Sequence, residues 1–385
     1  MKEIHLQNQL PLRPKIFPYF DIIFMDNQKC QIRAGDDKIF ILRGKTITEI
    51  LPKLFKFLNG DYTINQIANK CKDIASKEEI ITILARLNKD GLLEDASIKP
   101  PSQLNSKELK YYAPQLLFFS HFKGDKYNYQ IKLKESQIAI IGLGLLGSAI
   151  LLSLAVSGVG HITGIDYTNA SIHSSLNPYL TSHFDKLEAK ASSSLFDKIN
   201  PNIKYKRLNK IIQSKEDTLQ IVKGKDVVIV AIDKPQPAIN KWINESCLDE
   251  NVPWITSSGL TGIEGIIGPF IIPHETCCYK CYELREKSNM DSYDEYIAFE
   301  KYLEEREGLT ANYGHLPQFA AIMGSFVALE VLKHLTQFVL PETYGSLFSI
   351  NFITFQTQFH EVLKLPRCPS CGPAKDVPPK AFWAR

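Results

Sequence analysis

The chain has 385 residues, a formal net charge of +3 and 44% hydrophobic residues. This length favours two domains, or one large domain with an appendage. The small net charge, with Lys and Arg spread among Asp and Glu, gives no indication of nucleic-acid binding. The sequence contains no run of about 18 apolar residues, so no membrane-spanning helix is predicted. Residues 1–15 lack the apolar core of a signal peptide. We therefore expect a cytoplasmic protein with no nucleic-acid or membrane partner.

The first 95 residues contain three strand-like runs followed by three amphipathic helix patterns. The strand-like runs, separated by turn-forming residues, cover residues 20–25, 30–33 and 38–42. Ser76, with Glu79 three residues later, is a capping box that starts the third helix, and Gly91 ends it. This order predicts a small winged-helix-like α+β domain over residues 1–95. A polar, irregular linker is expected over residues 96–135.

From residue 136 onward, strand and helix patterns alternate. Strands are expected at 138–141, 161–165 and 226–231, with helices at 145–157 and near 186–199 between them. Such alternation predicts an open α/β sheet of the Rossmann type over residues 136–385.

Three glycines follow the first of these strands and open the next helix: Gly142, Gly144 and Gly147. This spacing lets the backbone approach a phosphate at the positive end of a helix dipole. Asp166 lies about 20 residues further on, at the end of the next strand, where a ribose-binding acid is expected. By itself the pattern would suggest NAD binding, and the alternative is tight strand–helix packing without a nucleotide.

The wider sequence resembles the family of ThiF, MoeB and ubiquitin-activating-type enzymes over about residues 136–372. The resemblance rests on GLGLLGSAILLSLAVSGVGHITGID from residue 142, DKLEAKASSSL from residue 185 and VVIVAID from residue 227. It implies an adenylating domain in which Asp166 binds the ribose of ATP, Lys190 contacts the phosphates and Asp233 holds Mg²⁺. A cation and a metal ion offset the charge on transferring phosphates, so Lys190 and Asp233 are the candidate catalytic residues.

Several positions depart from the pattern of that family. Ser175 replaces an asparagine, and Pro178 replaces an arginine and has no N–H to donate to a phosphate. Thr168 replaces a second aspartate, and a further arginine is missing near Ala238 or Ile239. Two interpretations therefore stay open, an active adenylating enzyme and a domain that has lost this chemistry.

Four of the eight cysteines form two C-x-x-C pairs, which predict a structural Zn²⁺ site with four thiolate ligands. The pairs are Cys278 with Cys281 and Cys368 with Cys371, and Cys277 is the neighbouring alternative to Cys278. The long separation of the two pairs is that of the ThiF-like family. Residues 282–367 contain no cysteine. Because many relatives carry a thioester-forming cysteine there, thioester chemistry is not expected in this chain, and Cys247 is assigned to the core.

Two features near the end of the chain have open roles. His315 precedes an apolar helix pattern at 320–335, and it is either a proton carrier or a residue with a satisfied hydrogen bond at the start of the helix. The charged, tyrosine-rich segment 290–306 corresponds to the family's crossover above the active site. We expect that segment to be mobile.

The N-terminal domain resembles the precursor-peptide recognition element of enzymes that modify ribosomal peptides. The resemblance rests on QIRAG from residue 31, LNGDYTI from residue 58 and LNKDGLLE from residue 87, directly before a ThiF-like domain. It implies that a leader peptide adds as a strand beside the third strand and packs against the third helix. DNA binding is the alternative, but the charges around residues 77–87 are mixed and form a poor phosphate-binding surface.

The two resemblances together imply ATP-dependent maturation of a ribosomally synthesised precursor peptide. The chain would bind the leader and activate a carboxylate or amide of the core for cyclisation, as in the stand-alone enzymes of microcin C and pantocin A biosynthesis. The alternative is a non-catalytic leader-binding partner of a YcaO-type azoline-forming cyclodehydratase, which Pro178 favours. A winged-helix regulator fused to an NAD sensor is a third class. The resemblance also implies a homodimer.

Overall fold

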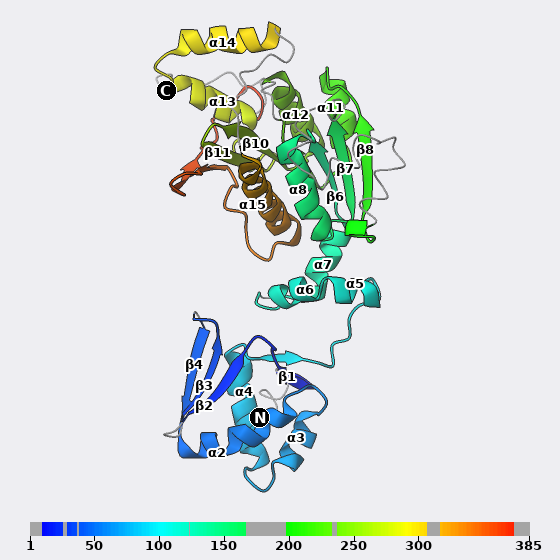
Figure 1. Cartoon of the computed structure of the whole chain (residues 1–385), viewed down its shortest axis with the longest axis vertical. Coiled ribbons are helices and arrows are strands. Elements are labelled where there is room, and N and C mark those ends of the chain that lie inside the picture. The colour runs from blue at the N-terminus through cyan, green and yellow to red at the C-terminus, as the bar shows by residue number, and fades with distance from the viewer. Residues whose placement is uncertain are drawn as a thin grey trace, which may run out of the picture. The chain divides into compact units, whose positions relative to one another are not determined.

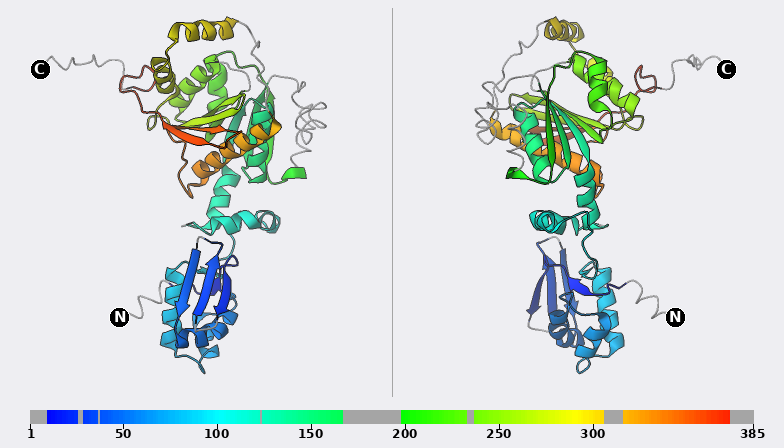
Figure 2. Two further views of the ribbon diagram at one scale, coloured as in Figure 1. Left: turned by 60° about the vertical axis from the view of Figure 1, so that its left-hand side comes forward. Right: turned by 90° about the vertical axis from the view of Figure 1, so that its right-hand side faces the viewer.

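The computed structural model describes residues 10–25, 29–36, 38–122, 124–166, 198–232, 237–305 and 316–372. The chain forms two compact units, Met1–Ser102 and Gln103–Arg385. Both units combine helices and strands, as Figures 1 and 2 show. Each unit has a hydrophobic core of its own.

The first unit contains the strands and helices predicted for it, in the predicted order. Its strands are β1 (Pro14–Ile16), β2 (Asp21–Met25), β3 (Lys29–Ala34), β4 (Lys38–Arg43) and β5 (Leu93–Asp95), and its helices are α2 (Lys45–Leu54), η1 (Phe55–Phe57), α3 (Ile64–Lys70) and α4 (Lys77–Lys89). Both residues of the predicted capping box are in place, since Ser76 accepts from the backbone of Glu79 and Glu79 accepts from the backbone of Ser76. The α+β composition is confirmed, and the winged-helix assignment stays a prediction.

Strands β2, β3 and β4 form an antiparallel sheet with β3 in the centre. Its inner face is apolar because every second residue points to the helices. Cys30 and Ile32 of β3 are fully buried there, opposite Leu42 and Phe40 of β4. Residues of α2, α3 and α4 complete this core, including Leu51, Ile67 and Leu84.

A second, two-stranded sheet joins the two ends of this unit. Strand β1 pairs antiparallel with β5, and the carboxylate of Asp95 accepts hydrogen bonds from the backbone nitrogens of Leu12 and Arg13 at 2.8 and 3.1 Å. Strand β1 was not predicted from the sequence. A three-residue strand that starts with Pro14 is too short to show a period-2 pattern.

The prediction of an irregular linker over residues 96–135 is wrong for most of that segment. The structure has three helices there: α5 (Ser106–Tyr111), α6 (Ala113–Phe119) and α7 (Lys126–Glu135). Leu133 is fully buried in the core of the second unit, and Asn200 donates hydrogen bonds to Tyr112 at 2.8 Å and to the carbonyl of Ala155 at 2.7 Å. These distant contacts stabilise a polar segment whose own periodicity is weak.

The second unit is built on a mixed eight-stranded sheet in the order β13-β12-β11-β10-β9-β6-β7-β8. Its strands are β6 (Gln137–Ile141), β7 (His161–Asp166), β8 (Lys204–Asn209), β9 (Val227–Val230), β10 (Trp254–Thr261), β11 (Glu264–Ile271), β12 (Ser346–Asn351) and β13 (Thr357–Glu361). Strands β10, β9, β6, β7 and β8 are parallel, and β11, β12 and β13 continue the sheet in antiparallel fashion. The predicted α/β sheet is confirmed.

Helices cover both faces of this sheet (Figure 2). The described helices that follow β6 are α8 (Leu145–Val156), α11 (Lys215–Val222), α12 (Pro237–Glu250), α13 (Tyr279–Ser288), α14 (Tyr293–Glu305) and α15 (Pro317–Thr336). One core is formed with α8 and α15 and another with α11 and α12. The helix predicted near 186–199 lies almost wholly outside the described residues. Most of segment 290–306, which we expected to be mobile, forms α14.

Helix α15 is long and apolar enough to cross a membrane by length and composition, contrary to the expectation from the sequence. It packs closely on α8, and Gly324 makes this possible, since a Cβ added there would lie only 2.7 Å from the Cβ of Ala149. Met323, Val327 and Val331 of α15 are fully buried. These contacts are those of a core helix.

Candidate nucleotide site and metal centre

The glycine-rich loop lies between β6 and α8, at the point where the order of the parallel strands reverses. From β6 the chain continues to β7 and β8 on one side, and later to β9 and β10 on the other. Ligands of open α/β sheets bind at such a switch point, beyond the carboxyl ends of the strands. Gly144 is the N-cap of α8 and provides no side chain to cap it. The first backbone N–H groups of α8 are therefore the natural donors to an anion.

Two of the three glycines are required by close backbone approach. Gly142 has a φ of 90°, and a Cβ there would lie 2.4 Å from the carbonyl oxygen of Ala231. A Cβ on Gly147 would lie 1.9 Å from the carbonyl oxygen of Gly142. Any larger residue at either position would push the loop away from β9 or from α8.

Asp166, the predicted ribose-binding acid, is attached directly to this loop. Its Oδ2 accepts a hydrogen bond of 2.6 Å from the backbone nitrogen of Leu143. The hydroxyl of Ser148 donates to the carbonyl oxygen of the same Leu143 at 2.8 Å. The end of β7, the loop and the first turn of α8 are thus held together by hydrogen bonds to one residue.

Tyr205 and Arg207 of β8 are neighbours of Asp166 that the sequence did not reveal. Burial raises the pKa of Tyr205 far above its usual value, with Asp166 adding to the rise and Arg207 opposing it. Gly164 and Arg207 are paired across the parallel strands β7 and β8. No strand was predicted over β8, where the basic residues Lys206 and Arg207 are adjacent and interrupt the alternation, and the sequence does not identify which strand lies beside it.

The other predicted nucleotide-site residues lie outside the described residues. Lys190 and Asp233 are among them, so their roles stay predictions. Thr168, Ser175 and Pro178, which differ from the family's pattern, also lie outside the described residues, and so does His315.

The structure brings the two C-x-x-C pairs together, although about 90 residues separate them. The Sγ atoms of Cys278 and Cys281 lie 3.8 Å apart, and Cys278–Cys368 and Cys281–Cys371 are each 3.5 Å apart. Four sulfurs in a tetrahedron around Zn²⁺, at about 2.3 Å each, would be separated by roughly 3.8 Å. The four thiols therefore fit a Zn²⁺ ion.

Local structure explains why these four cysteines meet. Cys278 is the N-cap of α13 and Cys281 lies in its first turn, while Gly372 donates to the carbonyl of Cys368 at 2.9 Å and closes the second knuckle. All four are buried and packed among apolar side chains. Cys277 is also buried, but it is not part of the cluster, and burial raises its pKa to about 12. The choice of Cys278 over Cys277 as a ligand therefore agrees with the geometry.

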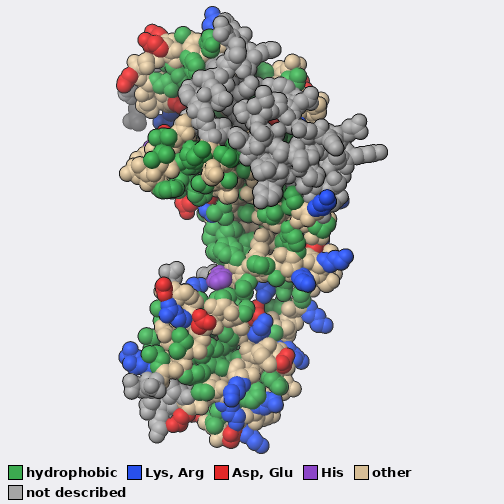
Figure 3. Space-filling model, in the orientation of Figure 1, with side chains coloured by type: hydrophobic (Ala, Val, Ile, Leu, Met, Phe, Trp, Pro, Cys, Tyr) green, Lys and Arg blue, Asp and Glu red, His purple; other side chains and the backbone are tan. Residues whose placement is uncertain are grey.

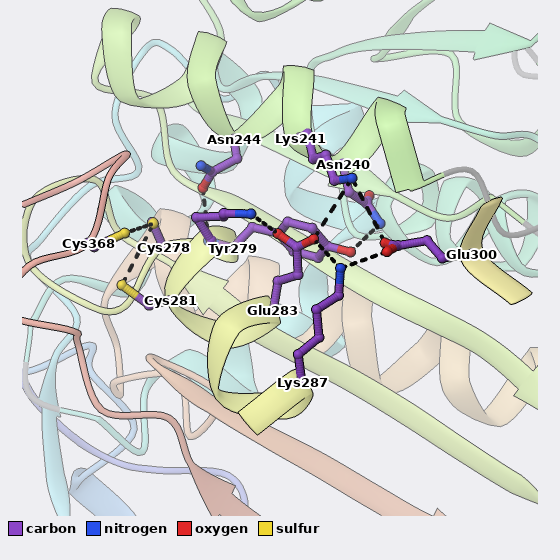
Figure 4. Close-up of polar contacts among 11 residues, drawn as sticks. Asn240, Lys241, Asn244, Cys278, Tyr279, Cys281, Glu283, Lys287, Glu300 and Cys368 are labelled. Atoms are coloured by element: carbon purple, nitrogen blue, oxygen red, sulfur yellow. Dashed lines mark hydrogen bonds and ion pairs between the residues drawn. The ribbon is translucent and has the colours of Figure 1, made fainter. Parts of the chain in front are cut away.

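A network of charged side chains follows the cysteines along α13 (Figure 4). Glu283 is 4% exposed and accepts hydrogen bonds from Lys280 at 2.8 Å and from Lys287 at 3.0 Å. Lys287 also donates to Glu300 of α14 at 2.6 Å, and Lys241 of α12 lies 3.8 Å from both carboxylates. Burial opposes ionisation of Glu283, but the hydrogen bonds from Lys280 and Lys287 outweigh it and hold its pKa below the usual value. The network ties α14 to α12 and α13.

Residues 112–372 match the ThiF family. The chain belongs to this family. The molybdopterin-synthase adenylyltransferase of Escherichia coli is 24% identical over 273 residues, covering 70% of this chain and 99% of that protein. The sulfur carrier protein ThiS adenylyltransferase of Escherichia coli is 29% identical over 245 residues, covering 63% of this chain and 88% of that protein.

Two solved structures are similar over nearly the whole chain. Escherichia coli MccB with ATP has a TM-score of 0.69 at 20% identity, covering 94% of this chain and 99% of that chain. PaaA has a TM-score of 0.67 at 21% identity, covering 90% of this chain and 99% of that chain. At these identities the similarity shows the shared fold.

The ThiF match begins inside the segment we had assigned to a linker and ends directly after Cys371. It therefore includes α7, the glycine-rich loop and both C-x-x-C pairs. The relatives named above are adenylyltransferases. A ThiF-family domain favours ATP over NAD at the glycine-rich loop.

Proposed function

We propose that this chain is an ATP-dependent enzyme that matures a ribosomally synthesised precursor peptide. The observation that carries the proposal is the extent of the similarity to MccB, which covers 94% of this chain and so includes both units. One such structure is described as the microcin C7 biosynthetic enzyme MccB in complex with N-formylated MccA. The adenylyltransferases named above, in contrast, cover at most 70% of the chain.

The proposed chemistry is placed at the glycine-rich loop. The phosphates of ATP would approach the N-terminus of α8, and Asp166, which is held against the loop by its hydrogen bond from Leu143, would bind the ribose. Lys190 would offset the phosphate charge and Asp233 would hold Mg²⁺. A carboxylate or amide oxygen of the precursor core would attack the α- or γ-phosphorus of ATP and expel pyrophosphate or ADP. The nitrogen of a neighbouring amide would then attack the activated carbon, expel AMP or phosphate and lose its proton to water as the ring closes.

The first unit would hold the leader. Strand β4 is an edge of its sheet, and α4 contributes Ile81 and Ala85 as half-buried residues in the same unit. An extended peptide can add to such an edge, with backbone hydrogen bonds supplying affinity. The mixed charges of α4 support a peptide rather than a nucleic acid as the ligand.

The proposed enzyme is a cytoplasmic homodimer. Figure 3 shows hydrophobic side chains on the visible part of the second unit, and several large apolar residues of this unit are exposed. They include Phe326 and Leu329 of α15 at 37% and 41% exposure and Phe359 of β13 at 56% exposure. An apolar surface of this kind is typical of a subunit interface.

A non-catalytic partner of a YcaO-type cyclodehydratase is the second candidate, and Pro178 in place of an arginine favours it. The deciding experiment incubates the full chain with ATP–Mg²⁺ and the peptide encoded by a neighbouring short reading frame. The enzyme should release AMP or ADP only when the peptide is present and should change the peptide mass. Tight binding of the peptide without nucleotide turnover would reject the enzyme and favour the partner role.

A further inference from the structure

The sheet of the first unit has two edges, β2 and β4, and they differ in charge. Lys38 and Arg43 are the first and last residues of β4, and both side chains are exposed. Among the described residues, neither is in an ion pair. Strand β2 begins with Asp21 instead and contains no basic residue. Edge strand β4 therefore has an exposed basic side chain at each end, whereas edge strand β2 has no basic side chain at either end.

The side chains between these two cations are apolar on both faces of the sheet. Phe40 and Leu42 point to the helix side, since they pair with the buried Ile32 and Cys30. Ile39 and Ile41 point to the outer face and are 45% and 52% exposed. A strand added to β4 would thus meet aliphatic or aromatic neighbours whichever way each of its central side chains points.

We propose that the segment which adds to β4 has an acidic residue at each end and four apolar residues between them. This inference rests on the leader-binding role proposed above and specifies the chemistry of the leader. Strand β4 is six residues long, and an added strand places one residue opposite each of its residues. The acidic residues would face Lys38 and Arg43, and the four apolar residues would face residues 39–42.

The pattern is the same for parallel and antiparallel addition, because β4 has a cation at each end. Backbone hydrogen bonds contribute affinity that depends little on sequence. Selection must therefore come from side chains, and an opposite-charge pair across two strands contributes about 1.5- to 5-fold in affinity. A peptide that forms two opposite-charge pairs with β4 should therefore bind about tenfold or more tightly than a peptide that makes two like-charge contacts at the same positions.

The probe is a fluorescein-labelled synthetic peptide, Gly-Ser-Glu-Val-Leu-Val-Leu-Glu-Ser-Gly-amide, titrated with the full-length chain. Its counterpart carries Lys in place of both Glu. At about 50 mM salt the acidic peptide should bind about tenfold more tightly by fluorescence anisotropy, and the difference should shrink at about 500 mM salt because exposed charges are screened. A third peptide with Pro in place of the second Val should lose binding, since Pro cannot complete a strand.

A charge exchange tests the assignment of the two cations. The double variant Lys38→Glu, Arg43→Glu should prefer the lysine peptide. Lys56→Glu, an exposed lysine on η1 outside the sheet, is the matched control and should retain the preference of the unmodified chain. Thermal denaturation of each variant shows whether its first unit is still folded.

Equal binding of the acidic and lysine peptides, or an unchanged preference in the folded double variant, would overturn the inference. So would the absence of binding by either peptide. None of these results bears on nucleotide turnover with a precursor peptide, which is measured separately and occurs in the second unit. Failure of the leader pattern and failure of the proposed enzyme are therefore distinguishable.

Discussion

The carboxylate of Asp166 accepts a hydrogen bond from the backbone nitrogen of Leu143, with a distance of 2.6 Å between the two atoms. This bond fixes the glycine-rich loop against the end of β7. A nucleotide bound by the loop would therefore have its ribose-binding acid already in place. Preorganisation of this kind lowers the entropy cost of binding.

Asp166→Asn should weaken ATP–Mg²⁺ binding by about tenfold or more, because a neutral amide makes a weaker hydrogen bond to a ribose hydroxyl and to Leu143. Isothermal titration calorimetry measures the effect. Asp226→Asn is the matched control, since Asp226 accepts from the backbone nitrogen of Gln137 at 2.7 Å at the other end of β6. That variant should keep the ATP affinity; an equal loss in both variants would mean that Asp166 acts only through stability.

Gly147→Ala should lower the free energy of unfolding by about 2–4 kcal/mol and remove ATP binding, because its Cβ would collide with the carbonyl oxygen of Gly142. Urea denaturation measures the stability. Gly224→Ala provides the comparison, since Gly224 has a φ of 73° but no atom within 4 Å of the added Cβ. Its cost should be about 1 kcal/mol, from backbone strain alone. Similar losses in both variants would contradict the role assigned to close packing.

Purified protein should contain about one Zn²⁺ per chain by mass spectrometric metal analysis. Cys368→Ser should lower both the zinc content and the melting temperature, because a structural zinc ion contributes directly to folding. Cys277→Ser removes a buried thiol outside the cluster and should leave the zinc content unchanged. Zinc-free protein prepared without chelators would refute the assignment.

Lys287→Met should lower the free energy of unfolding by about 1–3 kcal/mol, because it removes the cation that donates to both Glu283 and Glu300 and leaves only the more distant Lys241 near both carboxylates. Urea denaturation again provides the measurement. Glu295→Gln on the exposed side of α14 should change stability by at most about 0.5 kcal/mol. A stable Lys287→Met variant would show that α14 is held by other contacts.

The stability of the chain should fall as the pH falls below about 6.5, in part because of His334. Burial lowers the pKa of this residue to about 4, and its Nδ1 lies 2.5 Å from the hydroxyl of Tyr344. An unfolded histidine has a pKa of about 6.5, so the unfolded state binds more protons between these two values, and the contribution is complete only above pH 6.5. The loss between pH 7.5 and pH 5 should be about 1–2 kcal/mol.

His334→Gln should remove most of this pH dependence, as measured by urea denaturation at the two pH values. His360→Gln, on the exposed strand β13, should retain it. If the two variants showed the same pH dependence, the buried histidine would not be its source.

Local sequence determined the element order of the first unit and the position of the glycine-rich loop. Capping boxes, turn residues and side-chain periodicity all act within a few residues, so the start of α4 at Ser76 and the helix opened by Gly144 could be predicted directly. The two C-x-x-C pairs could also be recognised as metal-binding pairs from the sequence, because the spacing of the two cysteines within each pair is local.

Tertiary structure alone decided which distant segments meet. The pairing of β1 with β5, the packing of α5 to α7 and the position of Tyr205 and Arg207 beside Asp166 depend on contacts across many residues. The buried contacts of Glu283 with Lys287 and Glu300 likewise arise only when α13 and α14 are folded together. A polar segment or an isolated charge carries no local signal for such contacts, because its stabilisation comes from desolvated partners that only the folded chain supplies.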